Sequence, residues 1–304
     1  MRRALVVFNP NAAGVSHGTR DVIVRALGSE LKLEVAETKR RGHATHIAQG
    51  AAHDGTDVVV VFGGDGTLNE VVNGVAGSDV EVVPIPGGGT NVFARTMGYP
   101  KDPIEATAIA LERLQERAEP RKINLGRVNG RHFAFCCGLG IDAAVVRAVE
   151  RRSAVKKTIG EAFFVYSALR QLFFAYPRRD APMTISGPED IDAVRSMFVC
   201  NSDPFTFWGA RGFRLCPDAD PSSHLDVTAV TTMATARLLR IAWRAFGSGG
   251  HLKLPYVHAL HNVESLTVSC TRPVPYQVDG EFAGEADGFV FESVPQALSV
   301  VTAT

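Results

Sequence analysis

This chain of 304 residues has only five cysteines and two tryptophans, and its formal net charge is zero. The five cysteines form no CxxC pair and are odd in number, which argues against a disulfide framework and against a thiolate metal site. The 32 basic and 32 acidic side chains cancel, whereas nucleic-acid-coating proteins carry surplus cations. This balance of charges predicts that the protein has no nucleic-acid partner. Free thiols predict a cytoplasmic protein. The apolar start ends at the turn Asn9-Pro10 and is too short for a secretion signal.

Hydrophobic residues make up 45% of the chain, and its length suggests roughly two domains. Short β-branched runs predict buried strands at residues 4–8, 33–36, 58–62 and 80–85. Between these runs, apolar residues at helical spacing predict helices at residues 19–31, 43–53 and 68–75. This alternation predicts an N-terminal α/β domain with a parallel sheet, in which ligands bind beyond the carboxyl ends of the strands.

The second part of the chain has a different pattern. Asn129-Gly130, between apolar runs at 122–128 and 132–137, predicts a hairpin. Further apolar runs, separated by Pro, Gly and Asp, lie at residues 196–200, 225–231, 265–270, 276–278 and 289–292. They predict a mostly antiparallel β domain with helices inserted at 160–176 and 235–246.

A basic stretch at 145–179 interrupts the neutral pattern. It holds eight basic and two acidic residues, a net charge of +6, beside several aromatic side chains. Charged residues within it argue against a membrane span. Two interpretations stay open: transient contact with an anionic membrane surface, and a helix packed on the β domain with its charges in solvent.

The sequence GGDGT at 63–67 directly follows the predicted strand 58–62. Glycines let backbone N–H groups approach phosphates, and the helix predicted next offers an N-terminus that favours anions. A carboxylate in such a turn suits a cation or a proton transfer, so Asp65 is a candidate magnesium-linked or catalytic group. The alternative is an Asp-Gly turn without a ligand.

Two further turns follow neighbouring predicted strands, PGGGTN at 86–91 and NPNAAG at 9–14. Three polar or glycine-rich turns at three strand ends predict a nucleotide phosphate site. The pattern is neither the GxxxxGK[ST] phosphate loop nor the GxGxxG dinucleotide fingerprint.

A fourth element, VDGE at 278–281, lies far downstream. Glu281 is either an exposed residue at a hairpin tip or, if it faces the nucleotide site, a base that accepts a proton from a hydroxyl nucleophile. A carboxylate base with Mg²⁺ would suffice for phosphoryl transfer.

Together these motifs make the chain resemble the diacylglycerol kinase catalytic-domain family, in its bacterial soluble lipid kinase branch. The resemblance spans the chain, through GGDGTLNEVVNG at 63–74, PGGGTNVFAR at 86–95, PDAD at 217–220, VDGE at 278–281 and VPQAL at 294–298. GGDGT alone is shared with NAD kinases and is similar to a phosphofructokinase motif.

The resemblance implies an α/β ATP-binding domain at 1–124, completed by 293–304, and a β-sandwich lipid-substrate domain at 125–292. It also implies ATP and Mg²⁺ in a cleft between them, with Glu281 as general base and Asp65 organising metal and phosphates. The ATP-contacting residues carried over are Asn9, Pro10, Asn11, Ala12, Ala13, Thr38, Gly64, Asp65, Gly66, Thr67, Leu68, Asn69, Glu70, Gly89, Thr90 and Asn91.

Three positions depart from the family's pattern. Val92 and Asn124 stand where many members have Asp, and Ser222-Ser223-His224 replaces a loop with two Asp residues around a structural magnesium. The predicted function is ATP-dependent phosphorylation of a lipid hydroxyl, most simply of diacylglycerol to phosphatidic acid. Alternatives are a sphingoid-base kinase, an NAD-kinase-like enzyme and a nucleotide- or lipid-binding protein with a degenerate site; a homodimer is left open.

Overall fold

The computed structural model describes residues 1–150, 181–247 and 249–304. It divides into an N-terminal unit, Met1–Leu125 with Val294–Thr304, and a C-terminal unit, Gly126–Ser293. The chain passes from one unit to the other within strands β5 (Arg121–Val128) and β16 (Glu281–Val300). The predicted helix at 160–176 and most of the basic stretch 145–179 lie outside the described residues.

A parallel sheet forms the centre of the N-terminal unit. Its first four strands are β1 (Arg3–Phe8), β2 (Lys32–Glu37), β3 (Val58–Gly63) and β4 (Glu81–Pro86). The order is β2–β1–β3–β4, and Ser299 and Val300 of β16 add a further parallel pairing to β4. Every residue of β3 is buried, as expected for a strand covered on both faces. The predicted parallel α/β architecture is confirmed.

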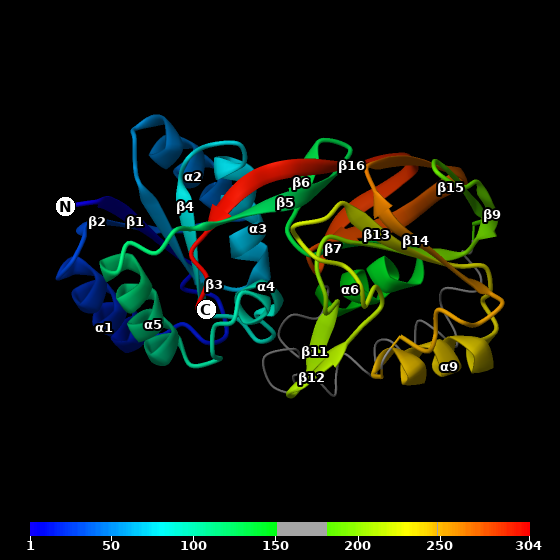
Figure 1. Cartoon of the computed structure of the whole chain (residues 1–304), viewed down its shortest axis with the longest axis horizontal. Helices are drawn as coiled ribbons and strands as arrows, with labels where there is room; N and C mark the ends of the chain where they lie inside the picture. Colours follow the sequence, from blue (N-terminus) through cyan, green and yellow to red (C-terminus); the bar gives the residue numbers. More distant parts are fainter. Residues whose placement is uncertain (151–180, 248) are drawn as a thin grey trace. The chain divides into compact units, whose positions relative to one another are not determined.

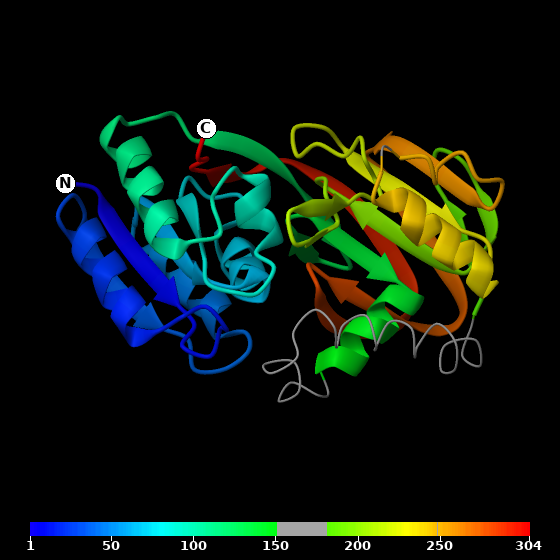
Figure 2. The same cartoon turned by 90° about the horizontal axis from the view of Figure 1, so that it is seen from below.

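Helices cover both faces of this sheet (Figures 1 and 2). The helices of the N-terminal unit are α1 (His17–Gly28), α2 (His43–His53), α3 (Asp65–Val75), α4 (Val92–Thr96) and α5 (Pro103–Gln115). Helices α1 and α5 lie together on one face, and α2 and α3 on the other. Helix α5, which the sequence pattern did not predict, begins at Pro103 because the Asp102 carboxylate accepts the N–H groups of Ile104 and Glu105, both at 2.9 Å.

Gly74 lets helix α3 approach α2 closely. A Cβ atom built on Gly74 would lie 2.6 Å from both the Ala48 Cβ and the Thr45 carbonyl oxygen. We therefore expect Gly74→Ala to lower the free energy of unfolding by about 2 kcal/mol, although alanine is the better helix former. Urea denaturation measures this. The matched control is Gly50→Ala in α2, where a Cβ would meet nothing within 4 Å and stability should rise by about 0.5–1 kcal/mol. Equal effects at the two positions would contradict the packing explanation.

The C-terminal unit is built from antiparallel strands. Besides parts of β5 and β16, they are β6 (Arg131–Phe133), β7 (Cys136–Leu139), β8 (Met183–Ser186), β9 (Ile191–Val194), β10 (Ser196–Cys200), β11 (Thr206–Trp208), β12 (Arg211–Phe213), β13 (Leu225–Val230), β14 (Val257–Val263) and β15 (Ser265–Val278). The predicted Asn129-Gly130 hairpin is present between β5 and β6. Strands β11 and β12 form a separate two-stranded ribbon.

Strand β15 contributes to both layers of a β-sandwich. Its first half pairs with β8, and its last residues, 276–278, pair with β7 in the series β14–β13–β10–β7–β15. The register shifts between Ser269 and Val274, where the strand passes from one set of partners to the other. Buried side chains from these strands, including Phe289 and Phe291 of β16, form one core. The predicted antiparallel sandwich is confirmed.

One predicted strand, 132–137, is wrong as a continuous element. The structure has two strands, β6 and β7, with Ala134 and Phe135 between them. The N–H groups of Ala134, Phe135 and Cys136 donate to the carboxylate of Asp279. A side chain more than 140 residues away thus takes the donors of this segment, and the apolar pattern cannot reveal it.

Among the residues that the structure describes in the C-terminal unit, the helices are α6 (Ile141–Glu150) and α9 (Thr235–Ala245). The latter confirms the helix predicted at 235–246. Within the part of the chain that the structure describes, no helix combines the length and the apolarity needed to cross a membrane.

Candidate active site: a phosphate-binding edge and a carboxylate hairpin

Three predicted turns meet at one edge of the N-terminal sheet. They follow β1, β3 and β4, which are parallel neighbours. The Gly14 N–H donates to the Gly87 carbonyl at 2.8 Å, and the Asn9 side-chain amide donates to the Thr67 hydroxyl at 3.1 Å. Residues 9–14, 63–67 and 86–91 therefore form one continuous surface, as the sequence predicted.

Glycines permit this close approach. A Cβ built on Gly88 would lie 2.7 Å from the Gly64 Cα, and one on Gly87 would lie 2.9 Å from the Gly63 nitrogen. Asn91 closes the last turn at φ +49°, because its side chain accepts the Gly88 N–H at 2.7 Å and donates to the Gly88 carbonyl at 2.9 Å. Asn91 thus shapes the backbone with the side-chain atoms that could otherwise contact a ligand.

Helix α3 starts within this surface. Its N-cap is Gly64, which has no side chain of its own to cap the first N–H groups, and the positive end of such a helix favours an anion. Asp65 is the first helical residue and is half-buried, and one carboxylate oxygen accepts the Phe93 N–H at 3.2 Å. The arrangement offers backbone donors to phosphate and a fixed carboxylate beside them.

Several residues of the predicted ATP set support this surface from within. Both carboxylate oxygens of Glu70 accept backbone N–H groups at the start of α2, from Gly42 at 2.6 Å and Ala44 at 2.9 Å. Leu68 and Asn69, in the first turns of α3, are buried. The Glu70 carboxylate therefore fixes the start of α2 beside the surface.

The remaining members of the set lie on the turns themselves or beside them. The Asn9 side chain accepts the Asn11 N–H at 3.0 Å and shapes the first turn, which also contains Pro10, Ala12 and Ala13. Thr38 follows β2 and donates its N–H to the Phe8 carbonyl at 2.9 Å. Gly66 lies in the first turn of α3, and Gly89 and Thr90 are accessible on the last turn. Their contacts with ATP remain predictions.

Glu281 lies at the tip of the β15–β16 hairpin in the C-terminal unit. It pairs with Val278 across the turn Asp279-Gly280, whose residues both have positive φ. The Arg131 guanidinium lies 3.6 Å from a Glu281 carboxylate oxygen and helps to fix its position. A half-buried carboxylate held on a tight hairpin is suited to accepting a proton.

Asp279 is the residue that sequence analysis missed. Its side chain is buried and accepts three backbone N–H groups, from Ala134 at 2.7 Å and from Phe135 and Cys136 at 3.0 Å. Charge-assisted bonds of this kind are strong. Asp279 therefore anchors the turn that presents Glu281, and no local sequence pattern announces partners so distant.

Two positions that depart from the family pattern have structural roles here. Val92 is buried at the start of α4. Asn124 is also buried and accepts the Gln296 N–H at 2.9 Å, which fastens β5 to the C-terminal segment within the N-terminal unit. Neither supplies a carboxylate.

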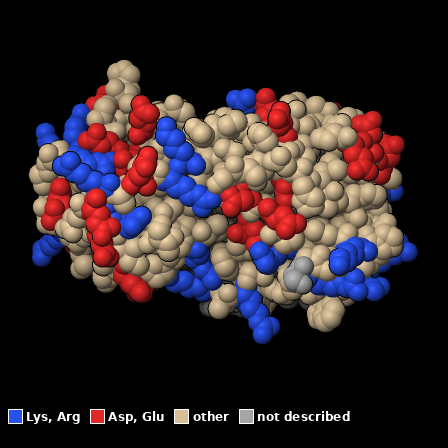
Figure 3. Space-filling model, viewed as in Figure 1, with Lys and Arg blue, Asp and Glu red and all other residues tan. Residues whose placement is uncertain are grey.

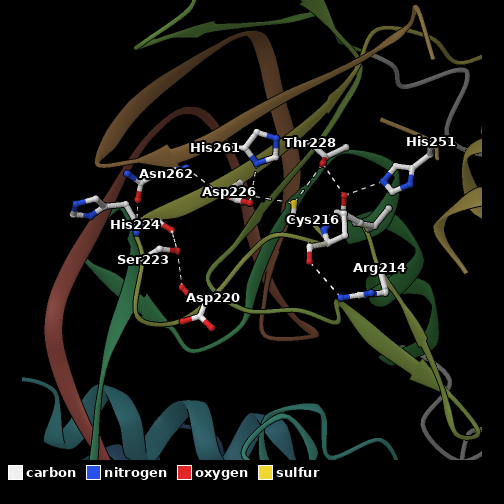
Figure 4. Close-up of polar contacts among 12 residues, drawn as sticks. Arg214, Cys216, Asp220, Ser223, His224, Asp226, Thr228, His251, His261 and Asn262 are labelled. Carbon is white, nitrogen blue, oxygen red and sulfur yellow. Dashed lines mark hydrogen bonds and ion pairs between the residues drawn. The ribbon is translucent and has the colours of Figure 1, made fainter. Parts of the chain in front are cut away.

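The loop with the third departure is closed by protein contacts (Figure 4). Asp220 accepts the Ser222 N–H at 2.7 Å, and the Ser223 hydroxyl donates to the Asp220 carbonyl at 2.8 Å. Nearby, Asp226 accepts from His261 and from the Asn262 N–H, both at 3.0 Å. Protein donors thus contact one Asp220 carboxylate oxygen and both Asp226 carboxylate oxygens. Among the described residues, no three His, Cys, Asp or Glu side chains form a metal-binding group.

His251, also in Figure 4, makes stability depend on pH. It is buried, its Nε2 donates to the Leu215 carbonyl at 3.0 Å, and burial lowers its pKa below 6.5. His251 therefore binds a proton more tightly in the unfolded chain than in the folded protein. Above pH 6.5 the histidine is neutral in both states and does not reduce the free energy of unfolding. Below pH 6.5 the unfolded chain takes up the proton first, and the free energy of unfolding falls by up to about 1.4 kcal/mol per pH unit.

We expect His251→Gln, which keeps a donor for Leu215, to flatten this dependence between pH 6.5 and 5. Unfolding midpoints in urea across that range measure it. His132, whose pKa burial also lowers, contributes in the same direction and retains its share in the variant. An unchanged slope would refute the role of His251.

Comparisons with known proteins agree with this architecture. The diacylglycerol kinase catalytic domain matches residues 3–128, and the YegS C-terminal NAD kinase beta sandwich-like domain matches residues 136–302. A diacylglycerol kinase of Bacillus subtilis is 26% identical, with 95% of this chain and 92% of the relative covered. One from Mycobacterium tuberculosis is 29% identical, with 85% and 81% covered.

A crystal structure of a diacylglycerol kinase from Bacillus anthracis superposes with a TM-score of 0.70 at 20% identity, covering 99% of this chain and 97% of that one. At this identity the likeness shows the fold. The two matched domains cover nearly the whole chain in order. The chain therefore belongs to the family in which a diacylglycerol kinase catalytic domain is joined to a YegS C-terminal NAD kinase beta sandwich-like domain.

Proposed function

We propose that this protein transfers the γ-phosphate of ATP to a hydroxyl group of a lipid, with diacylglycerol as acceptor and phosphatidic acid as product. The observation that carries the proposal is the match to both family domains together with relatives named diacylglycerol kinase along most of the chain. The glycine-rich edge at the start of α3 supports it, because the backbone there is arranged to receive phosphates.

In this proposal the backbone N–H groups around 64–67 and 89–91 hold the ATP phosphates. Asp65 would hold the Mg²⁺ that accompanies ATP, for which a carboxylate oxygen beside phosphates is a suitable ligand. Bound there, Mg²⁺ would neutralise charge on the phosphates. Glu281 accepts the proton of the lipid hydroxyl, and the oxygen forms a bond to the γ-phosphorus as the bond to ADP breaks.

The test is to incubate the purified protein with ATP labelled in the γ-phosphate and a total lipid extract. We expect label in the organic phase, and mass spectrometry of the labelled species identifies the acceptor. If the labelled product is a sphingoid-base phosphate, the protein is a lipid kinase with a sphingoid base as its acceptor. If all label stays on ATP, with Mg²⁺ as well as with Mn²⁺, the proposal of kinase activity is refuted. Tight ATP binding without transfer would favour a nucleotide- or lipid-binding protein with a degenerate kinase site.

A second candidate is phosphorylation of NAD. The C-terminal match to an NAD kinase beta sandwich-like domain, together with GGDGT, favours testing it. A labelled water-soluble product from ATP and NAD would support this candidate, and its absence beside labelled lipid would exclude it.

A further inference from the structure

Helix α9 has one face in the core and another in solvent. Ile241 and Ala245 are buried, and Ile241 belongs to a small core with Val230, Leu254 and Val257. This inner face fixes the helix on the β-sandwich. The opposite face therefore has a set orientation.

The outer face carries large apolar side chains. Leu239 is 44% exposed, Trp243 is 77% exposed, and Phe246, which caps the helix, is 41% exposed. Leu239 and Trp243 are four residues apart and so lie one above the other on the same face. Neighbouring exposed apolar residues of this size mark an interaction surface, because a solvated helix face is normally polar.

The same helix is strongly basic. Between Asp226 and Glu264 the sequence has no acidic residue, but it has four basic ones, Arg237, Arg240, Arg244 and Lys253. Arg237 lies over the Tyr256 ring at 5.1 Å, and Arg244 donates to the Gly250 carbonyl at 3.2 Å, while Arg240 is exposed. Figure 3 shows basic side chains gathered over α9 without acidic ones among them. The surface therefore suits an anionic partner.

Aromatic contact extends this surface beyond the helix. The Phe246 ring packs against Phe213 of β12 with centroids 4.9 Å apart. The β11–β12 ribbon also carries exposed Trp208 and exposed Arg211, and Figure 1 draws the ribbon and α9 along the same lower side of the C-terminal unit. The combination of basic and aromatic residues thus recurs on the adjacent element.

We propose that α9 is the surface with which this protein lies on an anionic lipid bilayer. Leu239, Trp243 and Phe246 enter the headgroup region, and Arg240 lies among the lipid phosphates. An amphipathic helix with arginines and a tryptophan beside its apolar residues has the chemistry of an interfacial helix. The inference deepens the proposed function and rests on it for its purpose, since a lipid acceptor resides in a bilayer.

Tryptophan fluorescence of the full-length protein tests the contact directly. The chain has two tryptophans, so Trp208→Phe leaves Trp243 as the sole reporter. With vesicles of phosphatidylcholine and phosphatidylglycerol in equal parts, and without ATP, we expect a blue shift of Trp243 emission and quenching by brominated lipid. Unchanged emission and no quenching would overturn the proposal.

Vesicle co-sedimentation measures how much each side chain contributes to the affinity for the bilayer. Trp243→Ala should weaken binding about tenfold. Arg240→Gln should weaken it about fivefold on vesicles with phosphatidylglycerol and leave binding to pure phosphatidylcholine unchanged. The matched control is Arg25→Gln, which removes an exposed charge from α1 and should have no effect.

Two further outcomes separate this proposal from others. The proposal would be overturned if Trp243→Ala bound vesicles as well as the wild type does. It would also be overturned if light scattering showed that this substitution converts a dimer to a monomer, because α9 would then contact a second copy of the chain. Transfer of phosphate to short-chain diacylglycerol in detergent micelles should survive in both variants. Vesicle binding without any transfer by the wild type would refute the proposed function alone.

Discussion

Replacing Glu281 by glutamine is expected to lower kcat for lipid phosphorylation by about 10²- to 10⁴-fold, the range that a positioned general base contributes. Glutamine keeps the size of the side chain and its place on the β15–β16 hairpin, but its amide oxygen cannot take the proton of the attacking hydroxyl. ATP binding, measured by calorimetry, should change little because the phosphates are assigned to the N-terminal unit.

The matched control is Glu292→Gln on the same strand. Glu292 pairs with Arg127 at 3.0 Å, and both side chains are partly exposed, so losing the pair should cost less than about 1 kcal/mol and leave kcat within about twofold. Equal activity of Glu281→Gln and the wild type would refute the assignment of the base. Equal losses in both variants would indicate a general effect of charge on this strand.

The second large effect is expected for Asp279→Asn. The carboxylate accepts three backbone N–H groups with both oxygens. An asparagine has one accepting oxygen, and its NH₂ group would face at least one of these donors. Leaving a buried donor unsatisfied and weakening the other bonds should lower the free energy of unfolding by about 3 kcal/mol, measured by urea denaturation.

Asp192→Asn serves as the control for this substitution. Asp192 is exposed and accepts one hydrogen bond, from the Thr184 hydroxyl at 2.9 Å, so its replacement should change stability by less than about 0.5 kcal/mol. Similar stabilities of the two variants would contradict the anchoring role of Asp279.

The fold was predictable where its determinants are local. Buried β-branched runs such as 58–62 form strands because both faces of the sheet are covered, and glycine-rich turns follow them at one edge of the sheet. The helix at 235–246 was also predicted from its spacing. Its exposed face was not, because apolar positions at helical spacing do not say which of them the core will cover.

The site was only partly predictable, for the same physical reason. The turns at 9–14, 63–67 and 86–91 could be expected to meet, since parallel neighbours end at one edge. The partners of Asp279 lie 143 to 145 residues away, and Glu70 caps a helix that begins 27 residues before it. Such long-range polar contacts leave no periodic pattern in the sequence.

The most direct test of the central assignment is one reaction that offers γ-labelled ATP both a lipid and a soluble acceptor. Diacylglycerol in micelles and NAD are supplied together with Mg²⁺, and the organic and aqueous phases are then separated. We predict labelled phosphatidic acid in the organic phase with the wild type and at least a hundredfold less with Glu281→Gln. Label found only in phosphorylated NAD, or remaining wholly on ATP, would contradict a lipid kinase.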